Sequence, residues 1–172
     1  AAGNSSAFLR AWIEGTAGND TFAFASRANL VAPGEVDGNG GTDTVSMTAP
    51  VTLGSGDFAN VTSVETLQLT GASTVTLGAD AATAGIVNIV TGAGTTGITD
   101  TNGVALSVDA TALADDLTLT LAGSAAQTVT GLRGDLAASG VSGALNVTTV
   151  AVASGLSIAT GSGSNTITAS AL

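Results

Sequence analysis

The sequence has no cysteine, histidine, tyrosine or lysine, and it sets only three arginines against thirteen acidic residues. Without cysteine no disulfide can form. Without His, Cys, Lys and Tyr, the usual general bases and nucleophiles of enzymes are missing. A net charge of −10 argues against nucleic acid and anionic membrane surfaces as partners, because affinity for both depends on Lys and Arg. The composition predicts a protein that is not an enzyme and that takes divalent cations as its counter-charge.

Aromatic residues are also scarce. They make up 3% of the chain against 44% hydrophobic residues, so the core must be built from Val, Leu, Ile and Ala. No apolar run approaches the roughly 20 residues that a membrane-spanning helix needs, and we expect no membrane insertion. The opening segment, AAGNSSAFLRAW, lacks the basic and apolar regions of a signal peptide, and the chain does not begin with Met. We expect a processed or excised piece of a longer protein.

From Thr44 onward, apolar and polar residues alternate with a period of two, as in TVSMT, DLTLTL and NTITA. β-Branched residues dominate these segments, which favours strands over helices. Glycine-containing turns at Gly71, Gly92, Gly123 and Gly161 follow one another at uneven and growing intervals, which indicates loops of different length on a common strand scaffold. The pattern predicts an all-β fold, either a solenoid or a β-sandwich. Only FANVTSVE and ATALADD interrupt it with possible short helical turns.

One helix is expected at the front of the chain, over Ser5–Glu14, with Asn4 or Ser5 as its cap and an apolar face that includes Trp12. We therefore divide the chain into an N-terminal cap or linker, residues 1–14, and a repeat domain, residues 15–172. The helix would cover the open end of the repeat domain or dock onto a neighbouring domain or subunit. Either role places Trp12 at a buried contact.

Two glycine-rich turns stand out, GTAGNDTFA over residues 15–23 and GNGGTDTVS over residues 38–46. Each places glycines ahead of an Asp, then a Thr, then a large apolar residue. Glycine permits tight turns, and a carboxylate in such a turn can join peptide carbonyls around a hard cation. The same residues are also good formers of ordinary turns. A third copy, TGSGSNTIT over residues 160–168, has the neutral Asn165 in the place of the Asp.

These turns resemble the nonapeptide G-G-x-G-x-D-x-U-x of the repeats-in-toxin group, which winds into a right-handed parallel β-solenoid, the β-roll, with calcium in its turns. The copies depart from it at Thr16 and Asn39, which replace the second glycine. The resemblance implies that calcium is the cofactor. Candidate ligands, as side chains or backbone carbonyls, are Gly15, Ala17, Gly18, Asp20, Gly38, Gly40, Gly41 and Asp43, and from their proximity Asp37 and Glu35, which would alternatively only solvate the second turn.

The first two copies stand alone, with residues 24–37 between them, rather than back to back. In this the chain looks like the surface-layer proteins and giant adhesins of Gram-negative bacteria, to which FANVTSVETLQLTG and VTGLRGDLAASGVSGALNVTT are also similar. That resemblance implies a structural module on the bacterial cell surface, outside the cell. Its folding and its self-assembly into a surface layer or filament would depend on calcium, and its partners would be copies of itself or neighbouring domains. The alternative is an adhesin module that binds a ligand, either a surface sugar or ice.

Several weaker signals remain open. Asp115 and Asp116 are either a metal-binding pair or an exposed acidic turn, and RGD at residues 133–135 matches an integrin-binding tripeptide. Enzymes with a parallel β-helix that act on acidic polysaccharides need basic residues, which three arginines do not supply. Four T-x-T triplets are candidates for one flat ice-binding face, although the irregular turn intervals argue against their register; they are Thr74-Val-Thr76, Thr118-Leu-Thr120, Thr128-Val-Thr130 and Thr166-Ile-Thr168.

Overall fold

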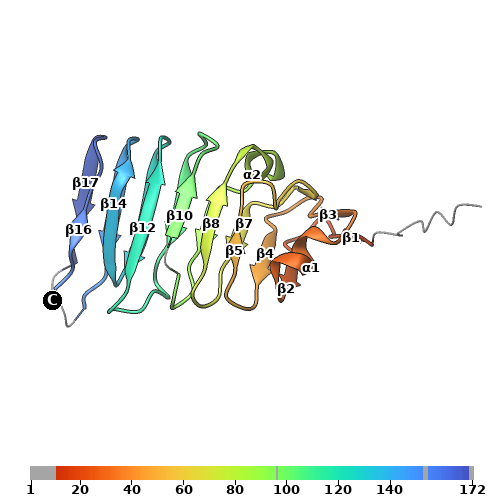
Figure 1. Ribbon diagram of the computed structural model, residues 1–172, viewed down its shortest axis with the longest axis horizontal. Helices are drawn as coiled ribbons and strands as arrows, with labels where there is room; N and C mark the ends of the chain where they lie inside the picture. Colours follow the sequence, from red (N-terminus) through yellow and green to blue (C-terminus); the bar gives the residue numbers. More distant parts are fainter. Residues whose placement is uncertain (1–10, 96, 153–154, 171–172) are drawn as a thin grey trace, which may run out of the picture.

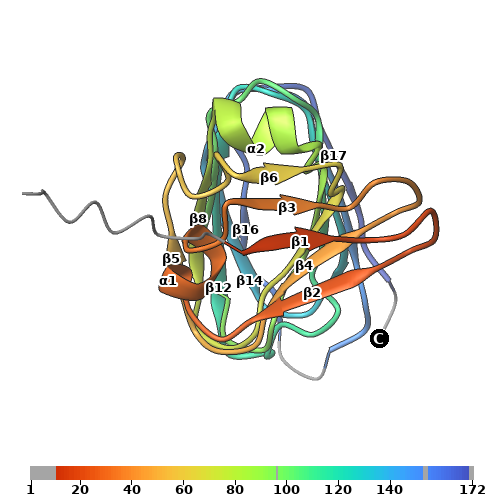
Figure 2. The same cartoon turned by 90° about the vertical axis from the view of Figure 1, so that its right-hand side faces the viewer.

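The computed structural model describes residues 11–95, 97–152 and 155–170. Every strand pair in it is parallel, and the chain winds into a β-solenoid of about seven turns. The elongated stack runs along the horizontal axis of Figure 1. Seen from its N-terminal end in Figure 2, the chain turns clockwise as it recedes from the viewer, which makes the coil right-handed. The predicted solenoid is confirmed, and the β-sandwich alternative is wrong.

Three sheets form the walls of the solenoid. The long sheet has eight strands, which are β2 (Thr21–Phe24), β4 (Thr44–Met47), β7 (Thr66–Gln68), β9 (Asn88–Val90), β11 (Leu106–Asp109), β13 (Gln127–Leu132), β15 (Leu145–Thr149) and β17 (Asn165–Thr168). The six-stranded sheet contains β5 (Thr52–Leu53), β8 (Thr74–Leu77), β10 (Gly97–Asp100), β12 (Thr118–Gly123), β14 (Asp135–Val141) and β16 (Ile158–Ala159). The short sheet lies in the first three coils and contains β1 (Trp12–Glu14), β3 (Glu35–Asp37) and β6 (Val61–Thr62).

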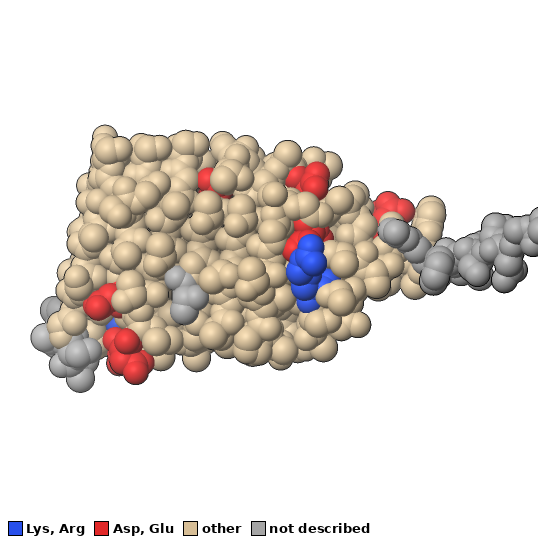
Figure 3. Space-filling model, in the orientation of Figure 1, with Lys and Arg blue, Asp and Glu red and all other residues tan. Residues whose placement is uncertain are grey.

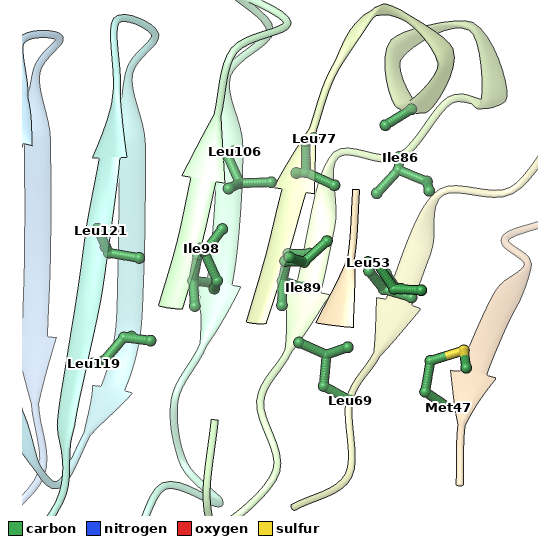
Figure 4. Packing of buried hydrophobic residues seen from close by; sticks show 14 of the residues in the cluster. Met47, Leu53, Leu69, Leu77, Ile86, Ile89, Ile98, Leu106, Leu119 and Leu121 are labelled. Atoms are coloured by element: carbon green, nitrogen blue, oxygen red, sulfur yellow. The ribbon is translucent and has the colours of Figure 1, made fainter. Parts of the chain in front are cut away.

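The core is a set of stacked aliphatic columns. Because side chains alternate between the two faces of a strand, every second residue points inward. One column in the long sheet consists of Phe22, Val45, Leu67, Ile89, Val108, Val129, Val147 and Ile167. Side chains from the opposite sheet, such as Leu53, Ile98 and Leu121, fill the space between the walls (Figure 4). Stacking of similar side chains explains why a core with so few aromatic residues suffices.

Coil length varies, and the strand register shifts within only two strand pairs, β12 with β14 and β13 with β15. In the long sheet, Thr21 pairs with Thr44 and Thr128 pairs with Asn146, and the second of these coils is the shorter one. The differences fall in the turns, while the inward columns continue. The expected loss of register between T-x-T triplets holds on the six-stranded sheet, where Gly97 pairs with both Thr74 and Thr120, so Thr74 aligns with Thr120 rather than with Thr118. It does not hold on the long sheet, where Thr128 and Thr166 lie in one column.

Two short helices replace strands within the coils. Helix α1 (Arg27–Val31) starts at Ser26, whose hydroxyl accepts a hydrogen bond from the backbone N–H of Asn29. Helix α2 (Ala79–Ala84) ends at Gly85, whose left-handed φ of 100° suits a helix C-terminus. In Figure 2, α2 continues the stack of the short sheet beyond β6. The sequence prediction missed both helices, and the two segments expected to hold helical turns, residues 58–65 and 110–116, form non-helical turns and strand β6 instead.

The N-terminal helix differs from its prediction. Residues 5–10 lie outside the described residues, and Trp12–Glu14 forms strand β1, paired in parallel with β3. The strand is favoured over a helix because its backbone groups form hydrogen bonds with strand β3 of the next coil. Trp12 is 70% exposed, so the expected burial of this side chain is wrong. The division of the chain at residue 14 stays a prediction.

Candidate functional site

The two glycine-rich motifs lie one above the other at the same corner of the solenoid. Residues 15–20 connect β1 to β2, and residues 38–43 connect β3 to β4. The next coil passes this corner through residues 63–65, between β6 and β7. We call these three stacked turns the acidic corner. The structure thus brings together the predicted site residues Gly15, Ala17, Gly18, Asp20, Asp37, Gly38, Gly40, Gly41 and Asp43.

Within the acidic corner, the carboxylates of Asp20, Asp43 and Glu65 form a column along the stack. Those of Asp43 and Glu65 each accept a hydrogen bond from the backbone of the preceding coil. Oδ1 of Asp43 accepts a hydrogen bond from the backbone N–H of Asp20, at 2.7 Å. One coil later, Oε2 of Glu65 accepts from the backbone N–H of Asp43, at 2.8 Å. Asp43 is 1% exposed, so its backbone and side chain lie in the interior. The column satisfies backbone donors at the point where the long sheet begins.

The remaining polar groups at the corner are also engaged. Oδ2 of Asp20 accepts from the backbone N–H of Thr16, at 2.5 Å, and from its hydroxyl, at 2.9 Å. Asp37 accepts from the backbone N–H of Asn39, at 2.9 Å, and this bond, followed by one from the Ser63 hydroxyl, lowers the pKa of Asp37. These contacts stabilise the ionised form of Asp37 without a metal ion.

Close approach between coils requires glycine at three positions of the first two motifs, Gly15, Gly38 and Gly41, and the φ of Gly41 is 120°. A Cβ at Gly38 would stand 2.5 Å from Oδ2 of Asp43, and one at Gly15 would stand 2.6 Å from the carbonyl oxygen of Gly38. Ordinary contact distances begin near 3.4 Å, so neither position accepts a side chain. Gly18 has open space around it, with its nearest neighbour at 3.6 Å. The motif glycines are therefore not equivalent: some permit stacking of the turns, and others do not.

Glu65 belongs to the acidic corner, although the glycine-rich motifs did not identify it. It lies one coil after Asp43, in the triplet Glu-Thr-Leu, which parallels Asp20-Thr-Phe and Asp43-Thr-Val. That shared pattern of acid, Thr and large apolar residue was the available signal, but no glycine precedes Glu65. Beyond it the column becomes aliphatic at Val87 and Leu106.

The fit of the corner to calcium is incomplete. Ca²⁺ takes six to eight oxygen ligands. Across residues 11–95, 97–152 and 155–170, no group of three or more acidic side chains converges in a way that could hold a metal ion. A calcium ion here would need most of its ligands from backbone carbonyls, and that of Gly15 already accepts from the side-chain amide of Asn39, at 2.9 Å. Calcium ligation at Asp20 and Asp43 stays a prediction.

The weaker sequence signals fall at separate places. Asp115 forms an ion pair with Arg133 at 3.0 Å, and Asp116 is exposed beside it. Asp135 accepts from the backbone N–H of Ser157, at 2.8 Å. Both charged members of the RGD tripeptide therefore have partners within the solenoid. At the third glycine-rich copy, the side-chain amide of Asn165 donates to the carbonyl oxygen of Gly161, at 2.9 Å.

The T-x-T triplets lie on two walls rather than one. Thr74-Val-Thr76 and Thr118-Leu-Thr120 belong to the six-stranded sheet, and the other two triplets belong to the long sheet. On the long sheet, one outward column is polar along its whole length and consists of Thr21, Thr44, Thr66, Asn88, Ser107, Thr128, Asn146 and Thr166. The long sheet therefore presents hydroxyl and amide groups at regular intervals. On the opposite wall, formed by the six-stranded sheet, Figure 3 shows few charged atoms.

No helix in the described part of the chain is long and apolar enough to cross a membrane. Comparison of the chain with protein-family models, curated proteins and solved structures finds no match.

Proposed function

We propose that the chain is a structural module of a bacterial cell surface that assembles with copies of itself into a surface layer or filament. The observation that carries the proposal is the in-register solenoid of about seven turns, held by a continuous parallel ladder. Such a stack extends in one dimension, and each coil contacts only its neighbours. A rigid, elongated unit of this kind is suited to a mechanical role.

The edges of the sheets support assembly. The first strand β2 and the last strand β17 of the long sheet each have one hydrogen-bonded neighbour. A strand edge presents unpaired N–H and C=O groups that can pair with another chain. Ile167, on β17, is 46% exposed although it continues a column whose earlier members, such as Val147, are buried. Contact with a further strand, from another copy or from a coil that continues this chain, would cover this side chain.

Calcium enters the proposal as counter-charge. Eight of the thirteen acidic residues lie between Glu14 and Asp80, and five of them lie at or beside the acidic corner: Glu14, Asp20, Asp37, Asp43 and Glu65. Carboxylates stacked on adjacent coils repel one another, and a divalent cation would reduce that repulsion. The proposal places Asp20 and Asp43 nearest to the ion, with folding or assembly strengthened outside the cell.

Circular dichroism and light scattering, each with calcium and with a chelator, test the proposal. We expect calcium to increase the light scattering of the protein and the chelator to reverse that increase. Asp20→Ala with Asp43→Ala should weaken the calcium response, whereas Asp116→Ala, which removes an exposed acid outside the corner, should preserve it. No change in scattering on addition of calcium at any protein concentration would refute calcium-dependent assembly.

A second candidate is a ligand-binding module, and the polar column on the long sheet favours it. Strand spacing of about 4.8 Å sets the interval between successive hydroxyl or amide groups. Such an array suits ice or a surface polysaccharide. An ice binder would shape growing ice crystals in the presence of a chelator, and Thr128→Leu should reduce that shaping. Scattering that rises with calcium, together with unshaped ice crystals, would favour the structural module.

A further inference from the structure

A buried polar pair interrupts the aliphatic core in the middle of the solenoid. Asp100, the last residue of β10, is 1% exposed and stands in a column between Leu77 and Gly123. Gln127, the first residue of β13, is fully buried in a column between Leu106 and Leu145. All other members of the long sheet's column from Val87 to Leu145 are aliphatic, so these two polar side chains are exceptions that need partners.

Gly123 leaves a space that both side chains border. Its backbone has a φ of 144°, and a Cβ placed on it would stand 2.9 Å from Nε2 of Gln127 and 3.0 Å from Cβ of Asp100. Cβ of Asp100 and the amide nitrogen of Gln127 therefore border the same small volume. A side chain at position 123 would fill it.

The hydrogen bonds around this volume leave two acceptor oxygens without a partner. Oδ1 of Asp100 accepts from the backbone N–H of Asn102, at 3.0 Å, but its Oδ2 is buried without a partner. Nε2 of Gln127 donates to the carbonyl oxygen of Ala122, at 3.1 Å, and its Oε1 is buried without a partner. Flipping the Gln127 amide would turn its oxygen toward that carbonyl, so the orientation is fixed.

Charged groups near the pair do not supply the missing donor. Strands β8, β9, β12 and β13, and the turns at residues 101–105 and 124–126, contain no ionisable residue. On β11, Asp109 faces outward and accepts from the N–H and hydroxyl of Thr111. Asp80, on α2, lies beside Gly56, and the guanidinium of Arg133 pairs with Asp115. A proton on Asp100 is thus the donor that this set of residues can provide.

We propose that Asp100 keeps its carboxyl proton in the folded solenoid and uses it as a hydrogen-bond donor toward Oε1 of Gln127, so that folding takes up one proton from solvent. Burial of a carboxylate without a compensating donor is unfavourable, whereas a neutral acid satisfies both orphan oxygens. Burial raises the pKa of Asp100, and the smaller opposing effect of the Asn102 N–H does not cancel the rise. The middle coils therefore fold more favourably in acid.

The sign of the pH dependence follows from proton uptake. Because the pKa is raised in the folded state, the contribution of Asp100 to stability is fully present below the pKa of an unfolded carboxyl, about 3.9. It is lost as the pH rises through the folded pKa. Over that interval, the folding equilibrium constant of the wild type should fall by up to about tenfold per pH unit relative to Asp100→Asn.

The experiment compares urea unfolding of the whole chain between pH 3 and pH 8, in chelator and in calcium. Asp100→Asn places an amide donor where the carboxyl proton was, so this variant should lose the fall in stability with rising pH that Asp100 contributes. Asp116→Asn, which removes an exposed charge, is the matched control and should keep it. Gln127→Glu should widen the pH interval, because two adjacent carboxyls share one proton.

A second measurement does not depend on any variant folding. Carbon-13 NMR of the folded wild type should show one buried aspartate carboxyl that titrates above the midpoint of an unfolded carboxyl. Three results would overturn the proposal. The first is an Asp100 titration at or below that midpoint, and the second is the same pH dependence of stability in the wild type and Asp100→Asn. The third is a titration midpoint of Asp100 that is lowered only when calcium is present, which would place a cation rather than a proton at the site.

Discussion

Asp43 could cap the backbone of the preceding coil or bind calcium, and two substitutions distinguish these roles. Asp43→Ala and Asp43→Asn should give different results. Its Oδ1 accepts the backbone N–H of Asp20 at 2.7 Å in a place that is 1% exposed. A hydrogen bond to a charged group contributes about 1.5–3 kcal/mol, and the orphaned N–H adds a desolvation penalty. On that basis we expect Asp43→Ala to lower the free energy of unfolding by about 2 kcal/mol in the presence of a chelator.

Asp43→Asn keeps an oxygen acceptor but loses the negative charge. If the carboxylate acts mainly as a cap for the preceding coil, Asn should stay within about 1 kcal/mol of the wild type in chelator, since a neutral hydrogen bond replaces a charged one. If it also binds calcium, the stabilisation that calcium gives the wild type should shrink in both variants. Urea unfolding followed by circular dichroism, in chelator and in calcium, measures all of these differences. Equal unfolding midpoints for the wild type and Asp43→Ala in chelator would refute the capping role.

Three further predictions concern the core, a turn and an ion pair. Leu67→Ala should lower the free energy of unfolding by about 2–5 kcal/mol, because Leu67 is fully buried and its truncation opens a cavity. Gln68→Ala, on the exposed face of the same strand, should change it by less than about 0.5 kcal/mol. Urea denaturation measures both, and equal losses would contradict the assigned faces. Gly38→Ala should unfold at lower temperature than Gly18→Ala, since only the first places a Cβ 2.5 Å from Asp43, and equal melting temperatures would show that the turns do not stack as described. For Asp57, burial raises the pKa, but the hydrogen bonds from Arg27 and the Gly54 N–H and the Arg27 charge outweigh it, so the net pKa is lowered. The stability that Asp57 contributes is therefore present above its pKa in the unfolded chain and is lost as the pH falls through its pKa in the folded protein. In unfolding experiments from pH 7 to pH 2, the wild type should lose stability relative to Asp57→Asn below about pH 4. The same pH dependence in both proteins would contradict a stabilising ion pair between Arg27 and Asp57.

The solenoid could be predicted because its signal is local and repeated. Period-two alternation identifies the strands, and the glycine-rich turns ahead of Asp20 and Asp43 identify a stacked corner. The two helices were not predictable in the same way. Helix α1 has five residues and α2 has six, so neither spans enough turns for a helical period to show. Tertiary contact with the neighbouring coils stabilises them, as it does any helix of this length.

The polar details of the interior depend on register, which cannot be read directly from the sequence. Asp100 and Gln127 lie on different strands of different sheets, and both border the space left at Gly123, which lacks a side chain. Glu65 joins the acidic column through the pairing of Thr44 with Thr66. The threonine triplets show the same dependence on register: Thr128 and Thr166 share a column of the long sheet, whereas Thr74 aligns with Thr120 rather than with Thr118 on the six-stranded sheet. Positions within a column become visible only when the coils are superposed.

The most direct measurement of the proposed function is electron microscopy of the protein in millimolar calcium and after addition of a chelator. The proposal predicts ordered sheets or filaments in calcium and dispersed single molecules in chelator. Dispersed molecules in both solutions, at concentrations well above those used for light scattering, would contradict it.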